Sequence, residues 1–175
     1  MGIQQINASY VADEDRVLLR LSTSADEEYR LWLTRALLLK FLDVSTEAAV
    51  TSLAQKHPVA QAQKIAEFQE EVMADKETFA QPFKPAPQTP LGEDPKLVKA
   101  ITATVEGQTC HMAFKLSSQQ TLTLHVGSDL LLKTKLLLNK IAAKAQWLPS
   151  TLTERKSGID TPGLQSDQAD HKVFH

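Results

Sequence analysis

Cysteine, glycine and long apolar runs are all scarce in this chain of 175 residues. Its one cysteine, Cys110, excludes an intramolecular disulfide and fits a reducing compartment. With six glycines the chain has few positions for close approach of the backbone to a phosphate, and it carries no GxSxG, HExxH, CxxC or glycine-rich phosphate-loop pattern. No apolar run approaches the roughly 18 residues that a membrane-spanning helix requires. We therefore expect no membrane contact and no cofactor, and no known motif points to catalysis.

Charge is also low overall but unevenly distributed. The formal net charge is −2, although residues 46–95 sum to −4 and residues 96–148 to +5. Two explanations are open: the acidic and basic parts pack together, or the basic part meets a polyanionic partner. The N-terminal MGIQQINASYVADED has neither the basic nor the apolar region of an export signal, so we expect a cytoplasmic protein.

An internal repeat is present in the chain. Four segments recur in the same order, with an offset of 95 residues that falls to 93 within a hairpin loop, where length changes are tolerated. The pairs are residues 6–10 and 101–105, 16–22 and 111–117, 29–33 and 122–126, and 37–40 and 130–133. Chance similarity between amphipathic stretches is the alternative, because alternation alone creates matches. The shared order favours a duplication.

Each copy is predicted to form three strands and a helix. Val17, Leu19 and Leu21 stand at every second position and so share one strand face. The same alternation continues at Tyr29, Leu31, Leu33, Cys110, Met112, Phe114, Leu116, Leu122, Leu124 and Val126. Helices are expected after Thr34 and after residues 127–129, since both places offer side chains that cap a first turn. Leucines cover so much of the second helix, 129–147, that it is buried on several sides or packs on another subunit.

The prediction is an α+β fold with antiparallel sheet packed on helices, in one domain at 1–148. Its two repeats cover about 1–45 and 96–148, and a helical connector at 46–81 joins them through a proline-rich linker at 82–95. Within the connector, 46–55 continues the first helix, His57-Pro58 interrupts it, and 59–80 resumes with an apolar stripe. The stripe consists of Ala62, Ile65, Phe68 or Gln69, Val72 and Phe79. Residues 149–175 are polar and are predicted to be a disordered tail.

The polar face of the first hairpin raises the question of function. If Leu21 pairs with Tyr29, then Arg20 lies opposite Arg30 and Leu18 lies opposite Trp32. Two cross-strand arginines repel each other, so an acidic group should cover them. The connector helix offers Glu67, Glu70, Glu71 and Asp75 for this role, and a second subunit could provide an equivalent cover.

Alternatively, this face binds single-stranded nucleic acid. Trp32 would stack on a base and Arg20 and Arg30 would meet phosphates, with Lys133, Lys135, Lys140 and Lys144 adding positive potential. Duplicated sheet units followed by helices resemble the architecture of the Whirly single-strand-binding proteins. The second copy weakens this hypothesis, because its corresponding positions are Ala113, Lys115, Thr123 and His125.

Metal and catalytic chemistry have little support. His111 and His125 share an outward face, but Cys110 points the other way and no third ligand stands at a suitable spacing, so we expect no metal site. Cys110 is predicted to be a small core residue, since no basic neighbour lowers its pKa. An enzyme whose groups assemble from distant positions stays open.

The segment VLLRLSTSADEEYRLWLTRALLLKFL, residues 17–42, resembles a group of small proteobacterial proteins that share its strand, its RLWLTR-like strand end and its leucine-rich helix. That group has no assigned activity, so the resemblance implies a bacterial, cytoplasmic origin and no site residue. From the residues we expect a non-enzymatic interaction or scaffold protein, self-associating through helix 129–147. Nucleic-acid binding is the first alternative, and an unrecognised small-ligand-binding protein or enzyme is the second.

Overall fold

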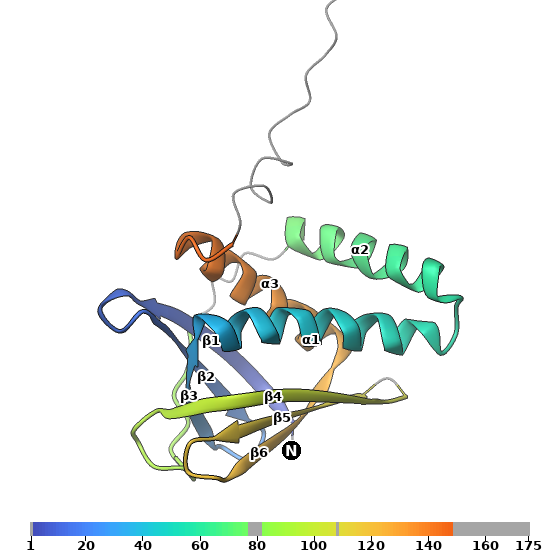
Figure 1. The fold of residues 1–175 in the computed structure, drawn as a ribbon. Coiled ribbons are helices and arrows are strands. Elements are labelled where there is room, and N and C mark those ends of the chain that lie inside the picture. The colour runs from blue at the N-terminus through green and yellow to red at the C-terminus, as the bar shows by residue number, and fades with distance from the viewer. Residues whose placement is uncertain (1, 77–81, 108, 149–175) are drawn as a thin grey trace, which may run out of the picture.

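The structure, a computed structural model, describes residues 2–76, 82–107 and 109–148, and shows a curled sheet with helices on one side (Figure 1). The connector residues 77–81, the Phe79 of the predicted stripe and the predicted tail lie outside the described residues. The strands are β1 (Ile3–Val11), β2 (Arg16–Thr23), β3 (Glu28–Thr34), β4 (Lys96–Glu106), β5 (Thr109–Leu116) and β6 (Thr121–Gly127). The helices are α1 (Arg35–Ala54), α2 (Val59–Lys76) and α3 (Ser128–Lys144), with a short 3-10 turn at Ala12–Glu14.

The six strands form one sheet in the order of the chain. Within each predicted repeat the strands pair antiparallel, as expected. Strands β3 and β4, which join the two repeats, pair in parallel, so the single sheet is mixed. The reason is the connection: α1, α2 and the proline-rich segment carry the chain back to the end of the sheet where β3 began, as a parallel pair requires. The sheet curls until Gly2, next to β1, forms a bridge with His125 of β6.

The inward face of this curled sheet is the hydrophobic core. Every residue predicted to face inward on β2, β3, β5 and β6 is buried, because alternation places these side chains on one side of each strand. Helices α1 and α3 cover that face and add Leu38, Phe41, Leu131 and Leu138 to the same cluster. Phe41 of α1 stacks on Phe114 of β5 with ring centroids 6.4 Å apart, so the two halves of the chain share one core.

The helix boundaries follow the predicted signals in part. Thr34 caps α1, since its side chain accepts a hydrogen bond from the Leu37 N–H, whereas α3 begins already at Ser128 and has no side-chain cap. As predicted, α1 continues to Ala54 and α2 starts after Pro58. Of the predicted α2 stripe, Ala62 is buried and Ile65 and Val72 are half-buried. The position given to Phe68 or Gln69 was wrong, because both are exposed, Phe68 at 65%.

Both halves of the chain show the element order strand, strand, strand, helix, and the α+β class is confirmed. The internal duplication itself stays a prediction. The leucine-rich helix α3 buries part of its apolar surface within the chain, because Leu131, Leu136 and Leu138 are buried where α3 packs on the sheet and on α1.

Candidate functional site

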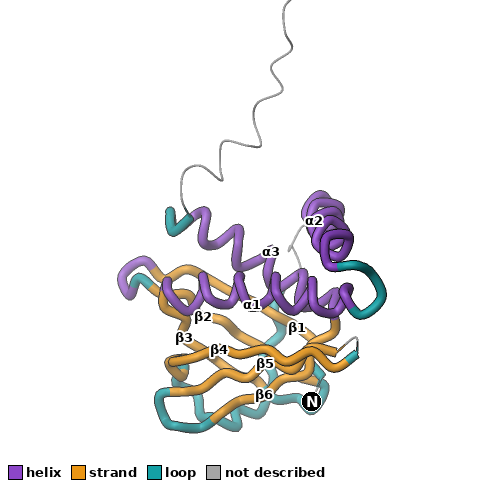
Figure 2. The backbone as a smooth tube through the Cα atoms, turned by 45° about the vertical axis from the view of Figure 1, so that its right-hand side comes forward, coloured by secondary structure: helices purple, strands orange, loops and turns teal. Residues whose placement is uncertain are grey.

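The outer face of the first hairpin has the predicted register but a different cover. Arg20 lies opposite Arg30 and Leu18 opposite Trp32. The acid between the arginines is Glu28, whose Oε1 accepts from Arg30 Nε at 2.7 Å and from Arg20 Nε at 2.9 Å. The prediction that acids of the connector helix would pair with the arginines was therefore wrong, because α2 packs on α1 and α3, away from the sheet (Figure 2).

The proline-rich segment lies over this cluster. The Phe83 ring stacks on the Arg20 guanidinium, 4.4 Å from ring centroid to Cζ. The Ala86 N–H donates to the second Glu28 carboxylate oxygen at 3.3 Å, and the Glu28 N–H donates to the Gln88 carbonyl at 2.7 Å. The segment is thus attached to the hairpin through both the backbone and the side chain of Glu28.

Glu28 is a buried carboxylate that accepts hydrogen bonds from the side chains of Arg20 and Arg30 and from the backbone of Ala86. Its side chain is fully enclosed, and burial by itself would raise its pKa. The hydrogen bonds and positive charges of Arg30 and Arg20 outweigh burial and hold the pKa of Glu28 below its usual value. Because Arg30 also donates to the Glu93 carbonyl at 3.0 Å, the cluster is a structural junction whose charges already have partners.

The five residues predicted as contacts do not form one surface. Arg20, Arg30 and the half-buried Trp32 lie on the outer face of the sheet. Lys133 and Lys135 belong to α3, in the helical layer over the opposite, inward face, where both line a groove. A single basic and aromatic platform is therefore absent from the described part of the chain.

The two histidines of the second hairpin are direct cross-strand neighbours. His111 lies opposite His125 with ring centroids 4.4 Å apart, and the His111 Nε2 is 3.5 Å from a Glu106 carboxylate oxygen. The described residues contain no group of three or more His, Cys, Asp or Glu side chains that could hold a metal ion. Cys110 is buried on the other face, as predicted.

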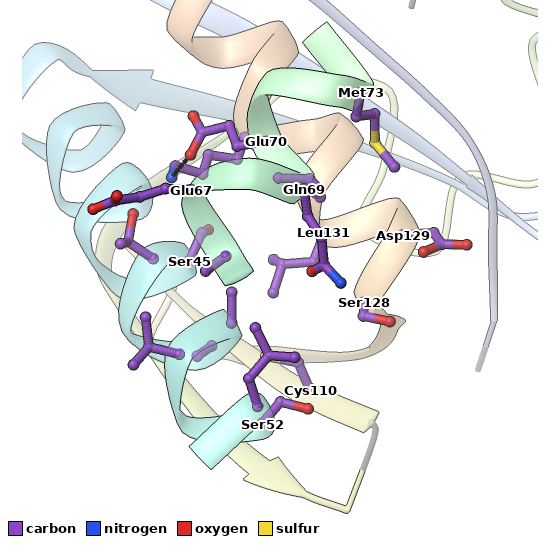
Figure 3. Close-up of a pocket in the computed structure, with 18 of the residues that line it drawn as sticks. Ser45, Ser52, Glu67, Gln69, Glu70, Met73, Cys110, Ser128, Asp129 and Leu131 are labelled. Carbon is purple, nitrogen blue, oxygen red and sulfur yellow. Dashed lines mark hydrogen bonds and ion pairs between the residues drawn. The ribbon is translucent and has the colours of Figure 1, made fainter. Parts of the chain in front are cut away.

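The feature best suited to binding is a groove between the three helices, here called the three-helix groove. It has a volume of about 860 Å3 and lies between the second half of α1, the middle of α2 and the start of α3, with strands β4 and β5 at its floor (Figure 3). Its apolar lining includes Ala48, Ala49, Leu53, Ala66, Val72, Met73, Val105, Leu131 and Leu132.

Polar side chains from all three helices also line the groove, and they differ in their hydrogen bonding. Lys135 donates to Glu70 across α3 and α2 at 2.5 Å, so this pair bridges the two helices. Cys110 lies at the floor, and burial raises the pKa of its thiol. Ser45 is 1% exposed, and its hydroxyl has no hydrogen-bond partner in the described structure.

Helix α2 covers the groove without belonging to the core. None of its described side chains is part of the hydrophobic cluster, and Ala62 is its one buried apolar residue in the described range. Both large apolar side chains that are mostly exposed in the described part, Val59 and Phe68, are on this helix. Such shallow attachment gives α2 a low free energy of local opening compared with α1 and α3.

We therefore expect backbone amides of α2 to exchange with deuterium well before those of α1. The physical reason is that opening α2 exposes little apolar surface, whereas opening α1 exposes the core. Hydrogen-exchange mass spectrometry on the full chain measures both helices in one experiment. Equal protection of α1 and α2 would contradict this prediction.

Sequence reasoning reached Lys133 and Lys135 but not the groove that they line. The amphipathic pattern of α2 carried no signal for the groove, and a serine within a helix carries no signal that its hydroxyl will be buried. A partial signal was the run of small residues around Ala48 and Ala49, which leaves room beside α1.

No helix in the described ranges has the length and apolar character to cross a membrane. Comparisons of the chain with protein-family models, curated proteins and solved structures find no match.

Proposed function

We propose that this protein is a non-enzymatic binding protein that takes up a small, largely apolar molecule in the three-helix groove. The observation that carries the proposal is the groove itself, a concave space of about 860 Å3 with a mainly apolar wall. Sites for drug-sized ligands are roughly 300–1,000 Å3 and combine an apolar lining with a few polar groups. The weakly attached α2 provides a route for entry and release.

The test uses the uncharged dye Nile red as a probe and a substitution that fills the groove. Wild-type protein should bind one dye molecule with saturable fluorescence enhancement. Ala49→Phe should weaken that binding at least tenfold, because the ring occupies the space beside α1 that the dye would use. The matched control is Ala36→Phe, at an exposed position of the same helix outside the groove, which should leave binding unchanged.

A second readout does not depend on any variant. Cys110 is the one thiol in the sequence and lies at the groove floor, so its alkylation by iodoacetamide reports access to the groove. Saturating Nile red should slow that alkylation. If the dye binds Ala49→Phe as tightly as wild type and leaves Cys110 equally accessible, the groove is not its site and the proposal fails.

The other functional hypotheses keep the status of predictions. Self-association through α3 and a scaffold role are compatible with a bound ligand, and so is a cytoplasmic location. The structure disfavours nucleic-acid binding through Arg20 and Arg30, since Glu28 neutralises part of their charge and the Phe83 ring lies on Arg20.

A further inference from the structure

The buried hydroxyl of Ser45 distinguishes one wall of the three-helix groove. Two other hydroxyls of these helices bond back to their own helix: Thr46 donates to the Leu42 carbonyl at 2.9 Å and Thr134 to the Leu130 carbonyl at 2.6 Å. Ser45 makes no such bond although it is buried, and Figure 3 shows it among the side chains that line the groove. A buried hydroxyl without a partner is unfavourable, so in native proteins it calls for an explanation.

The charges around the groove balance. Three lysines and three acids line it, and one of each is already joined in the Lys135–Glu70 pair. The lysines are Lys56, Lys133 and Lys135, and the acids are Glu67, Glu70 and Asp129. A site for a carboxylate or a phosphate would instead show an excess of positive charge or a cluster of arginines. The formal charge of this lining therefore favours a ligand without net charge.

From these two observations we infer the chemical class of the ligand: an uncharged molecule with an apolar body and one hydrogen-bonding group, such as an alcohol, a ketone or an amide, which pairs with the Ser45 hydroxyl. This inference rests on the proposed function. The apolar body packs against Ala48, Met73 and Leu131, while the polar group satisfies Ser45. A hydroxyl both donates and accepts, so it serves either kind of partner group.

The experiment compares three eight-carbon probes by displacement of Nile red: 1-octanol, 1-chlorooctane and octanoate. Ser45→Ala should weaken 1-octanol about tenfold, because one hydrogen bond is lost, and leave 1-chlorooctane unchanged. Ser52→Ala is the matched control, since this second groove serine already donates to the Gly107 carbonyl at 3.4 Å; neither probe should change. Octanoate should bind wild type less tightly than 1-octanol.

The outcomes separate this inference from the proposed function. If Ser45→Ala weakens 1-octanol and 1-chlorooctane equally, or neither, the hydrogen bond to Ser45 is refuted while the groove remains a binding site. If octanoate binds more tightly than 1-octanol, the uncharged class is refuted. If no probe displaces Nile red and Ala49→Phe does not affect the dye, the proposed function itself is wrong. The melting temperature of Ser45→Ala should not fall, because the variant loses an unpaired hydroxyl and no contact that holds the fold.

Discussion

Replacing Glu28 with glutamine should lower the free energy of unfolding by about 3 kcal/mol at pH 7. The substitution keeps the shape of the side chain but removes the negative charge between Arg20 and Arg30, which then repel each other under the proline-rich segment. Urea denaturation of both proteins gives the difference directly. The matched control is Glu14→Gln, whose pair with Arg16 is exposed, and its effect should stay within about 0.5 kcal/mol.

The pH dependence of this difference identifies its cause. The pKa of Glu28 is lower in the folded protein than its ordinary value near 4.5, so its ionised form stabilises the fold fully above that value. The contribution is lost as the pH falls through the lowered folded-state pKa. We therefore expect the gap between wild type and Glu28→Gln to persist from pH 7 to pH 5 and to shrink toward pH 3. A gap that is the same at every pH would indicate lost packing instead of lost charge.

Phe41→Ala should cost about 4 kcal/mol, the range for removing a large buried aromatic side chain. Phe41 is 1% exposed and stacks on Phe114, so truncation leaves a cavity where α1 meets the second half of the sheet. Denaturant unfolding of the variant and of wild type measures the loss.

The matched control is Phe68→Ala, which removes the same ring from an exposed position on α2 and should change stability by less than about 0.5 kcal/mol. If Phe41→Ala does not fold, Phe41→Leu retains most of the apolar volume and should cost about 1 kcal/mol. Similar losses for Phe41→Ala and Phe68→Ala would contradict the placement of the core.

The pairing of Glu28 with the two arginines could have been predicted from the sequence of one hairpin. Glu28 lies two residues before Arg30, and strand alternation places both on the same face, beside Arg20 of the neighbouring strand. The sequence therefore contained the ion cluster within one hairpin. The prediction of a partner in the connector helix was wrong because the amphipathic pattern of α2 does not indicate which surface that helix will contact.

Alternation by itself determined the strands and their buried faces and limited the hairpin register to even-numbered shifts, because a strand has only two faces and one of them must be apolar. The Thr34 cap and the His57-Pro58 break likewise act through the few residues around them. Only the tertiary structure decided the parallel pairing of β3 with β4, the position of α2 over α1 and α3, and the groove that encloses Ser45. These features depend on how segments far apart in the chain share space, and such packing leaves no periodic signal in any one segment.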